Sequence, residues 1–117
     1  MMQLQSCVQE LTVMQMRKIE VLSSALNDLA DIVGYISHEL YNPSAAHKLV
    51  DDFYKKVTKL KDNPELYTVH ESETVKTVFR KMTLGGYLVF YTVTDEYVYI
   101  AFVLHSLQDV DRILETY

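Results

Sequence analysis

Residues 78–107 read VFRKMTLGGYLVFYTVTDEYVYIAFVLHSL and carry the strongest structural signal in the chain. The runs YLVFYTV (87–93) and YVYIAFVLH (97–105) are rich in the aromatic and β-branched residues that favour strands. Gly85-Gly86 and Thr94-Asp95-Glu96 are turn signals on either side of the first run. The stretch therefore predicts an antiparallel meander, with strands over 75–84, 87–93 and 97–105.

The residues before this meander predict one strand and two helices. Residues 16–22 alternate as a short strand, with Ile19 and Val21 on one face. The first helical stripe is Leu26, Leu29, Val33, Ile36 and Leu40, and the second is Ala46, Leu49, Val50, Phe53, Val57 and Leu60. Ser23 and Ser24 offer hydroxyls to cap the first helix. Asn42-Pro43 ends that helix and starts the second, and so short a link predicts an antiparallel hairpin.

The order of elements predicts an α+β domain. It has an N-terminal strand, an antiparallel helical hairpin, a three-stranded antiparallel meander and a short C-terminal helix over 107–114. One helical layer on the sheet is the economical packing. Residues 66–75 show no clear period and are expected to form a loop. The N-terminal strand must join the meander from outside, and the residues do not say which strand it pairs with.

Length and composition fit one soluble domain. The 117 residues, 49% of them hydrophobic, can bury a core without disulfides, and Cys7 is a single cysteine. We expect a domain over 16–117, preceded at 1–15 by an extension that is either a short amphipathic helix or an addition upstream of a start at Met14 or Met16. No apolar run is long enough to span a membrane, so a cytoplasmic location is expected. The net charge of −5 argues against a general nucleic-acid binder.

The residues that could carry chemistry form no known enzyme template. Phosphate-loop, dinucleotide and paired metal-ligand patterns are missing from the sequence, so we expect no cofactor and no metal, and enzymatic activity is left open. Weak catalytic candidates are Arg80, Lys81, Tyr87 and His105. His105 lies at the end of an apolar strand, where functional side chains often project, although it could instead cap the sheet edge or the last helix. Arg80 and Lys81 point to opposite sides of one strand, and the outward one could hold a phosphate or a carboxylate.

Tyrosines on the strands are candidates for partner contacts. Tyrosine is first of all a strand former, but it is also enriched at protein interfaces. We predict partner contacts at Tyr87, Tyr91, Tyr99 and Arg80.

Three stretches of this sequence resemble a known family. The stretches LNDLADIVGYIS (26–37), NPSAAHKLVDDFYKKVTKL (42–60) and FRKMTLGGYLVFYTVTDEYVYIAFVLHSLQD (79–109) resemble the RelE/ParE superfamily of bacterial toxins, and the likeness covers about residues 16–114. The resemblance implies the toxin of a type II toxin–antitoxin system of the plasmid-stabilisation type. Such a toxin inhibits growth and is neutralised by a cognate antitoxin.

Five positions bear on the branch of this superfamily. Leu88, Leu107 and Gln108 stand where the endonuclease branch carries basic residues, and an RNA-cleaving site needs cations around the scissile phosphate. The ParE-like branch tolerates a leucine in the strand and commonly has a histidine where His105 stands, although Thr92 replaces its usual arginine. The resemblance therefore favours a ParE-like toxin that binds a target such as DNA gyrase.

Two alternatives accompany this interpretation. The first is a ribosome-dependent mRNA endonuclease of the RelE type that uses Arg80, Lys81 and His105. The second is a non-toxic binding module with the same fold. The implied partners are a cognate antitoxin and either gyrase or the ribosome, with no membrane, and homodimer formation is left open.

Overall fold

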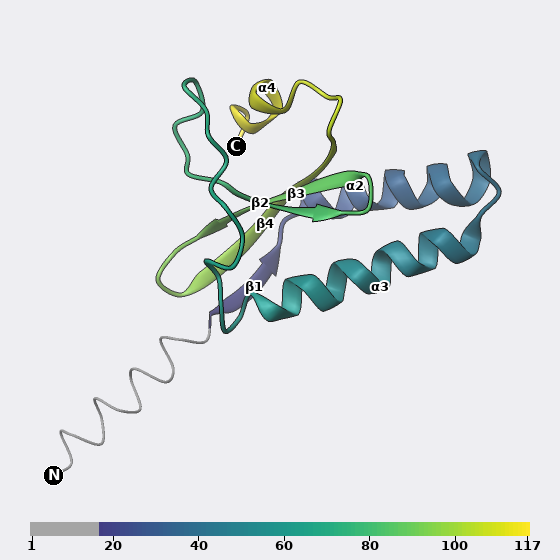
Figure 1. Ribbon diagram of the computed structural model, residues 1–117, viewed down its shortest axis with the longest axis horizontal. Coiled ribbons are helices and arrows are strands. Elements are labelled where there is room, and N and C mark those ends of the chain that lie inside the picture. The colour runs from purple at the N-terminus through teal and green to yellow at the C-terminus, as the bar shows by residue number, and fades with distance from the viewer. Residues whose placement is uncertain (1–16) are drawn as a thin grey trace, which may run out of the picture.

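The computed structural model describes residues 17–117, and its elements follow the predicted order (Figure 1). They are β1 (Lys18–Val21), α2 (Ser23–Gly34), the π-helical turn η1 (Tyr35–Glu39), α3 (Pro43–Lys59), β2 (Arg80–Leu84), β3 (Tyr87–Val93), β4 (Tyr97–His105) and α4 (Val110–Leu114). The α+β class, the helical hairpin and the meander are confirmed. The predictions about residues 1–15 lie outside the described residues. No helix in the described part of the chain is long and apolar enough to cross a membrane.

The sheet has the strand order β1-β4-β3-β2, which places β1 beside β4. This pairing is parallel and runs from Lys18 opposite Tyr97 to Val21 opposite Ile100. The three meander strands pair in antiparallel fashion, as predicted. β2 is shorter than predicted because its ladder with β3 ends where Arg80 faces Tyr91, and Val78 before it is 66% exposed. The last helix also begins later than predicted, at Val110.

The two faces of the sheet carry separate apolar clusters. The hairpin of α2 and α3 covers one face, which we call the helix face, and the loop after α3 covers the other together with α4 (Figure 1). The second face, here called the aromatic face, buries Phe79, Phe90, Ala101, Phe102, Leu104 and Leu114. A register shift in the β3–β4 ladder at Phe90/Tyr91 lets Ala101 and Phe102 both lie in this cluster, while Ile100 and Val103 join the helix-face core.

The second predicted helical stripe is confirmed, since Ala46, Leu49, Phe53, Val57 and Leu60 are buried. The first stripe is partly wrong. Leu26 and Leu40 are 45% and 56% exposed, while Ala25, Leu29 and Ile32 face the core. The helix is rotated from the predicted face because its polar side chains bind the neighbouring strand. Ser24 Oγ donates to the carbonyl of Ala101 at 2.5 Å, so it does not cap α2, whose N-cap is Leu22.

The link between the helices behaves as predicted. The side chain of Asn42 accepts a hydrogen bond from the backbone N–H of Ala45 at 3.1 Å, and Pro43 is the first residue of α3. This cap fixes where the chain reverses and therefore how α3 returns along α2.

The outer edge of β4 is closed by side chains where β1 ends. An open edge would expose backbone groups that can pair with another chain. The contacts that close it are Ser24 Oγ to Ala101 O at 2.5 Å, Val103 N to Asp28 Oδ2 at 3.0 Å and His105 N to Gln108 Oε1 at 2.7 Å. The edge of β2 is covered by the backbone of the loop after α3, where Lys81 N donates to Thr68 O, and by the side chain of Lys56, whose Nζ donates to Thr83 O.

Candidate functional site

Tyr87 and His105 form one corner of the helix face. They are direct cross-strand partners, and their rings meet edge to face with centroids 5.6 Å apart. His105 Nδ1 accepts a hydrogen bond from the backbone N–H of Leu107 at 3.1 Å. A neutral ring with that acceptor carries its proton on Nε2. The histidine therefore caps the turn after β4, and it offers Nε2–H as its second polar group.

Two carboxylates lie beside this corner. Asp28 and Asp31 of α2 line a cavity of about 160 Å³ together with Tyr87 and His105. Burial raises the pKa of Asp28 and the nearby Asp31 raises it further, although the hydrogen bond from Val103 N–H opposes the shift. A phosphate group would meet negative charge here, so the corner suits a neutral or cationic group.

Arg80 lies on the same face but at the other end of the sheet. It pairs with Tyr91, four residues along β3 from Tyr87, which is about 13 Å at the usual rise per residue. Its guanidinium donates to the carbonyl of Tyr67 at 2.7 Å. Arg80 also lines a cavity of about 280 Å³ with Glu65 and Asp95. The structure therefore does not bring Arg80 and His105 into one site.

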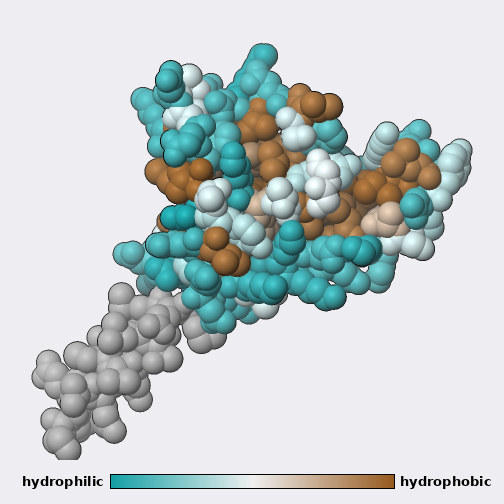
Figure 2. Space-filling view, viewed as in Figure 1, coloured by the Kyte–Doolittle hydropathy of each residue, from teal (hydrophilic) through white to brown (hydrophobic). Residues whose placement is uncertain are grey.

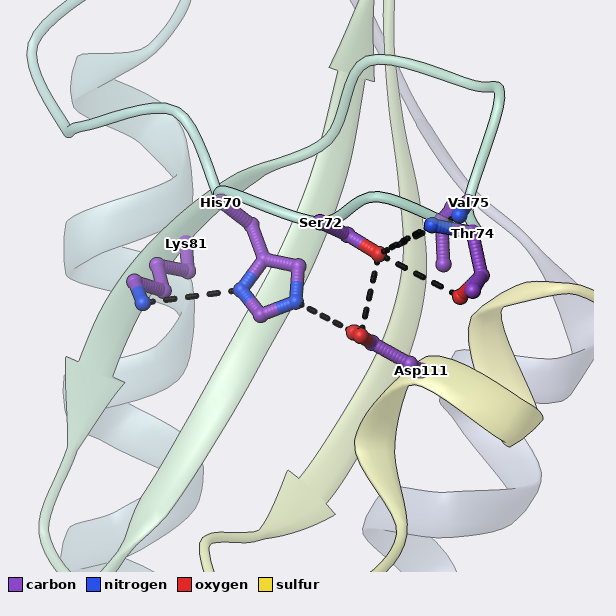
Figure 3. Close-up of polar contacts among 6 residues, drawn as sticks. All are labelled: His70, Ser72, Thr74, Val75, Lys81 and Asp111. Carbon is purple, nitrogen blue, oxygen red and sulfur yellow. Dashed lines mark hydrogen bonds and ion pairs between the residues drawn. The ribbon is translucent and has the colours of Figure 1, made fainter.

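Lys81 lies on the aromatic face, where it meets a polar cluster that joins three segments (Figure 3). Lys81 Nζ is 3.5 Å from His70 Nδ1, and His70 Nε2 is 2.7 Å from Asp111 Oδ1. Ser72 Oγ donates to Asp111 Oδ2 at 2.9 Å. The hydrogen bonds from His70 and Ser72 hold the pKa of Asp111 below its ordinary value.

This arrangement differs from a nucleophilic site. The Ser72 hydroxyl donates to the carboxylate of Asp111, whereas an activated serine donates to a histidine. Its oxygen also accepts from the backbone N–H groups of Thr74 and Val75. Both ring nitrogens of His70 have partners, and its side chain is 15% exposed. The cluster ties the loop after α3 to β2 and α4.

His70, Ser72 and Asp111 were not candidates from the sequence. They come from a loop without a period and from a helix 39 to 41 residues further along the chain. Only Lys81 was singled out, for its charge on a strand. Neither spacing nor composition connects these positions, so the cluster could not be found before the fold was known.

The predicted partner-contact tyrosines have different environments. Tyr91 is fully buried and its hydroxyl donates to the carbonyl of Pro64 at 2.9 Å, so in this fold it presents no surface for the predicted partner contact. Tyr99 is half-buried on the aromatic face beside β1, and its ring stacks on Tyr97 at 5.3 Å. Tyr87 is also half-buried. Roles for Tyr87 and Tyr99 in partner contact stay predictions.

The positions that depart from the endonuclease pattern now have a place in the fold. Leu88 packs half-buried against the aromatic-face cluster, and Thr92 is buried. Leu107 is 87% exposed, and Gln108 holds the backbone of His105. None of these side chains supplies a cation to either face. Among residues 17–117, no group of three or more His, Cys, Asp and Glu side chains could hold a metal ion.

Comparison with known proteins agrees with this fold and sequence pattern. The strand, the helical hairpin, the mostly antiparallel sheet and the short last helix are those of a RelE/ParE-like fold. The family model described as the ParE toxin of type II toxin-antitoxin system, parDE, matches residues 19–110, and the chain belongs to this family. The resemblance seen in the sequence is thus confirmed at the level of the family. Membership in a type II toxin–antitoxin family implies an antitoxin partner.

A solved structure shows the same fold. The structure described as "Chromosomal ParDE TA system from P. aeruginosa" is similar with a TM-score of 0.64 and 22% sequence identity. The similarity covers 78% of this chain and 97% of that chain. No curated protein matches the sequence.

Proposed function

We propose that this protein is a growth-inhibiting cytoplasmic toxin that acts by binding DNA gyrase and is neutralised by a cognate antitoxin. The observation that supports binding over RNA cleavage is the separation of the candidate catalytic groups. Arg80 and Lys81 lie on opposite faces, and each already has a protein partner. His105 lies beside Asp28 and Asp31, which would repel the phosphate that an endonuclease must hold.

The exposed residues at the free end of the helical hairpin are evidence for a protein-binding surface. Figure 2 shows apolar surface at this end of the molecule. Tyr35, Leu40 and Tyr41 at the turn between α2 and α3 are 47%, 56% and 87% exposed. Clustered exposed apolar side chains of this kind are typical of interaction sites. We infer that the antitoxin covers this surface.

The closed strand edges favour one docking mode over another. A strand added to the sheet would have to displace the side chains that hold the edge of β4 or the contacts of Lys56 and Thr68 on β2. An amphipathic antitoxin helix placed against the hairpin needs no such displacement. Helix docking is therefore the mode that we propose.

A gyrase supercoiling assay with the purified full-length protein tests the proposed target. We expect inhibition of supercoiling, relieved by the product of the adjacent antitoxin gene. A Leu40→Ser/Tyr41→Ser variant should still inhibit gyrase but should escape the antitoxin. Leu26→Ser, at another exposed leucine of the hairpin, is the matched control and should behave like the native protein in both respects.

Two other outcomes would overturn the proposal. Supercoiling that is unaffected at high molar excess, combined with cleaved message in a translating extract, would establish the endonuclease. Unaffected supercoiling, intact message and normal growth on forced expression would establish a non-toxic binding module.

If the target is gyrase, a plasmid that carries the toxin–antitoxin pair should be retained better than one without it.

A further inference from the structure

The aromatic face of the sheet is covered at the end of the chain by α4. Phe79 and Phe90 have no exposed surface, and Phe102 is 8% exposed. Leu114 of α4 is buried in the same cluster, and the Tyr117 ring meets Phe79 edge to face with centroids 5.2 Å apart. If residues 110–117 moved away from the sheet, they would therefore expose an apolar patch built from these three phenylalanines.

The helix that forms this cover is weak by itself. α4 has five residues, fewer than an isolated helix needs to be stable in water. Asp109 at its N-cap makes no side-chain hydrogen bond. The residues that connect β4 to α4 are exposed, including Leu107 at 87%. An open surface cavity of about 360 Å³ lies between the end of α4 and residues 74–77.

The polar contacts of Asp111 supply a hold outside the apolar cluster. Asp111 receives hydrogen bonds from His70 and Ser72, which both belong to the loop that covers the same face (Figure 3). Ser72 also binds the backbone of that loop, and Lys81 joins His70 to the sheet. The Asp111 side chain is 41% exposed, so water competes for these bonds whenever the helix moves.

We propose that residues 110–117 are a hinged cover that opens and closes as a unit over the aromatic face, with the contacts of Asp111 to His70 and Ser72 as its latch. The exposed residues 106–109 are the hinge. Opening is local, because the strands keep their ladder and the helical hairpin packs on the opposite face. In the open state Phe79, Phe90 and Phe102 meet solvent. The inference is independent of the proposed gyrase target.

Hydrogen exchange on the full-length protein tests this cover, with Asp111→Ala as the variant and Glu115→Ala, at an exposed acid of the same segment, as the matched control. Asp111→Ala should speed exchange of the backbone amides in 110–117 on the order of tenfold to a hundredfold, the value of one or two hydrogen bonds. Exchange in β3 and β4 should not change. Glu115→Ala should resemble the native protein, since the Glu115 side chain is exposed and makes no hydrogen bond or ion pair within residues 17–117. Binding of a dye that fluoresces on apolar surfaces should rise only for Asp111→Ala.

Ser72→Ala provides a second, milder variant in case Asp111→Ala disrupts folding. It removes one of the two bonds to Asp111 and should give a smaller acceleration in 110–117. It also removes the acceptor of the Thr74 and Val75 N–H groups, so these two amides should exchange faster as well. Equal exchange in the Asp111→Ala and Glu115→Ala variants would refute the latch. Acceleration that extends equally to β3 and β4 would refute an independently opening cover, because the helix would then be part of the global fold.

Discussion

Substituting Tyr91 by phenylalanine separates a core role from a partner-binding role for this residue. Tyr91 is fully buried, and its hydroxyl donates to the carbonyl of Pro64, which lies just after α3. The variant keeps the ring and removes this one bond. It also leaves the Pro64 carbonyl without its donor, so we expect a loss of about 1–2 kcal/mol in the free energy of unfolding.

For a domain of this size, that loss corresponds to a fall of about 4–8 °C in the melting temperature. The pH dependence should change as well. Burial raises the pKa of Tyr91 above its ordinary 10.0, so the fold loses stability as the pH rises through that range, and phenylalanine removes this loss. Thermal unfolding at neutral and alkaline pH measures both effects.

Tyr41→Phe is the matched control, because Tyr41 is 87% exposed. The melting temperature of this variant should equal that of the native protein. Antitoxin binding by folded Tyr91→Phe should match the native protein. If Tyr91→Phe melted at the native temperature and lost binding of the antitoxin, the buried hydrogen bond would be unimportant and the original partner-contact prediction would be right.

Four further substitutions, at three positions, test the local physics of the fold. The pKa of Asp28 is raised above its ordinary value of 3.8, so ionising this side chain costs the folded state stability as the pH rises from that value. Asp28→Asn removes the charge, and the variant should therefore be at least as stable as the native protein at neutral pH. Asp28→Ala should lose about 1–2 kcal/mol in urea unfolding at the same pH, since Val103 N–H then lacks its acceptor. Asn42→Ala should cost about 1 kcal/mol, measured in the same way, through loss of the α3 cap. Gly85→Ala should lower the free energy of unfolding by about 1 kcal/mol, measured by thermal unfolding, because Gly85 has a φ of +61°. The added Cβ would lie 3.7 Å from Leu49 Cδ1, which is an ordinary contact, so the cost comes from the backbone.

The local elements were predictable because their signals are short in range. Gly85-Gly86 set the hairpin between β2 and β3, and the bounds of β3 and β4 agree with the aromatic runs. Asn42-Pro43 marked the start of α3 for the same reason, since the cap bond spans three residues. The family resemblance rests on the same stretches.

Contacts between distant residues were not predictable. The face of α2 was misjudged because Ser24 and Asp28 bind β4 residues about 75 to 77 positions away. Tyr91 looked like an interface residue by type, but the sheet turns it into the core, where it meets Pro64.

Two signals act over only a few positions: the alternation of polar and apolar residues, and the residue types that favour turns. The sequence alone therefore established the order of elements, the meander and the family. Pairing between distant segments depends on how the layers pack, which no local pattern encodes. Tertiary structure therefore determined that β1 lies parallel to β4, that Arg80 and His105 lie at opposite ends of the sheet, and that Asp111 meets His70 and Ser72.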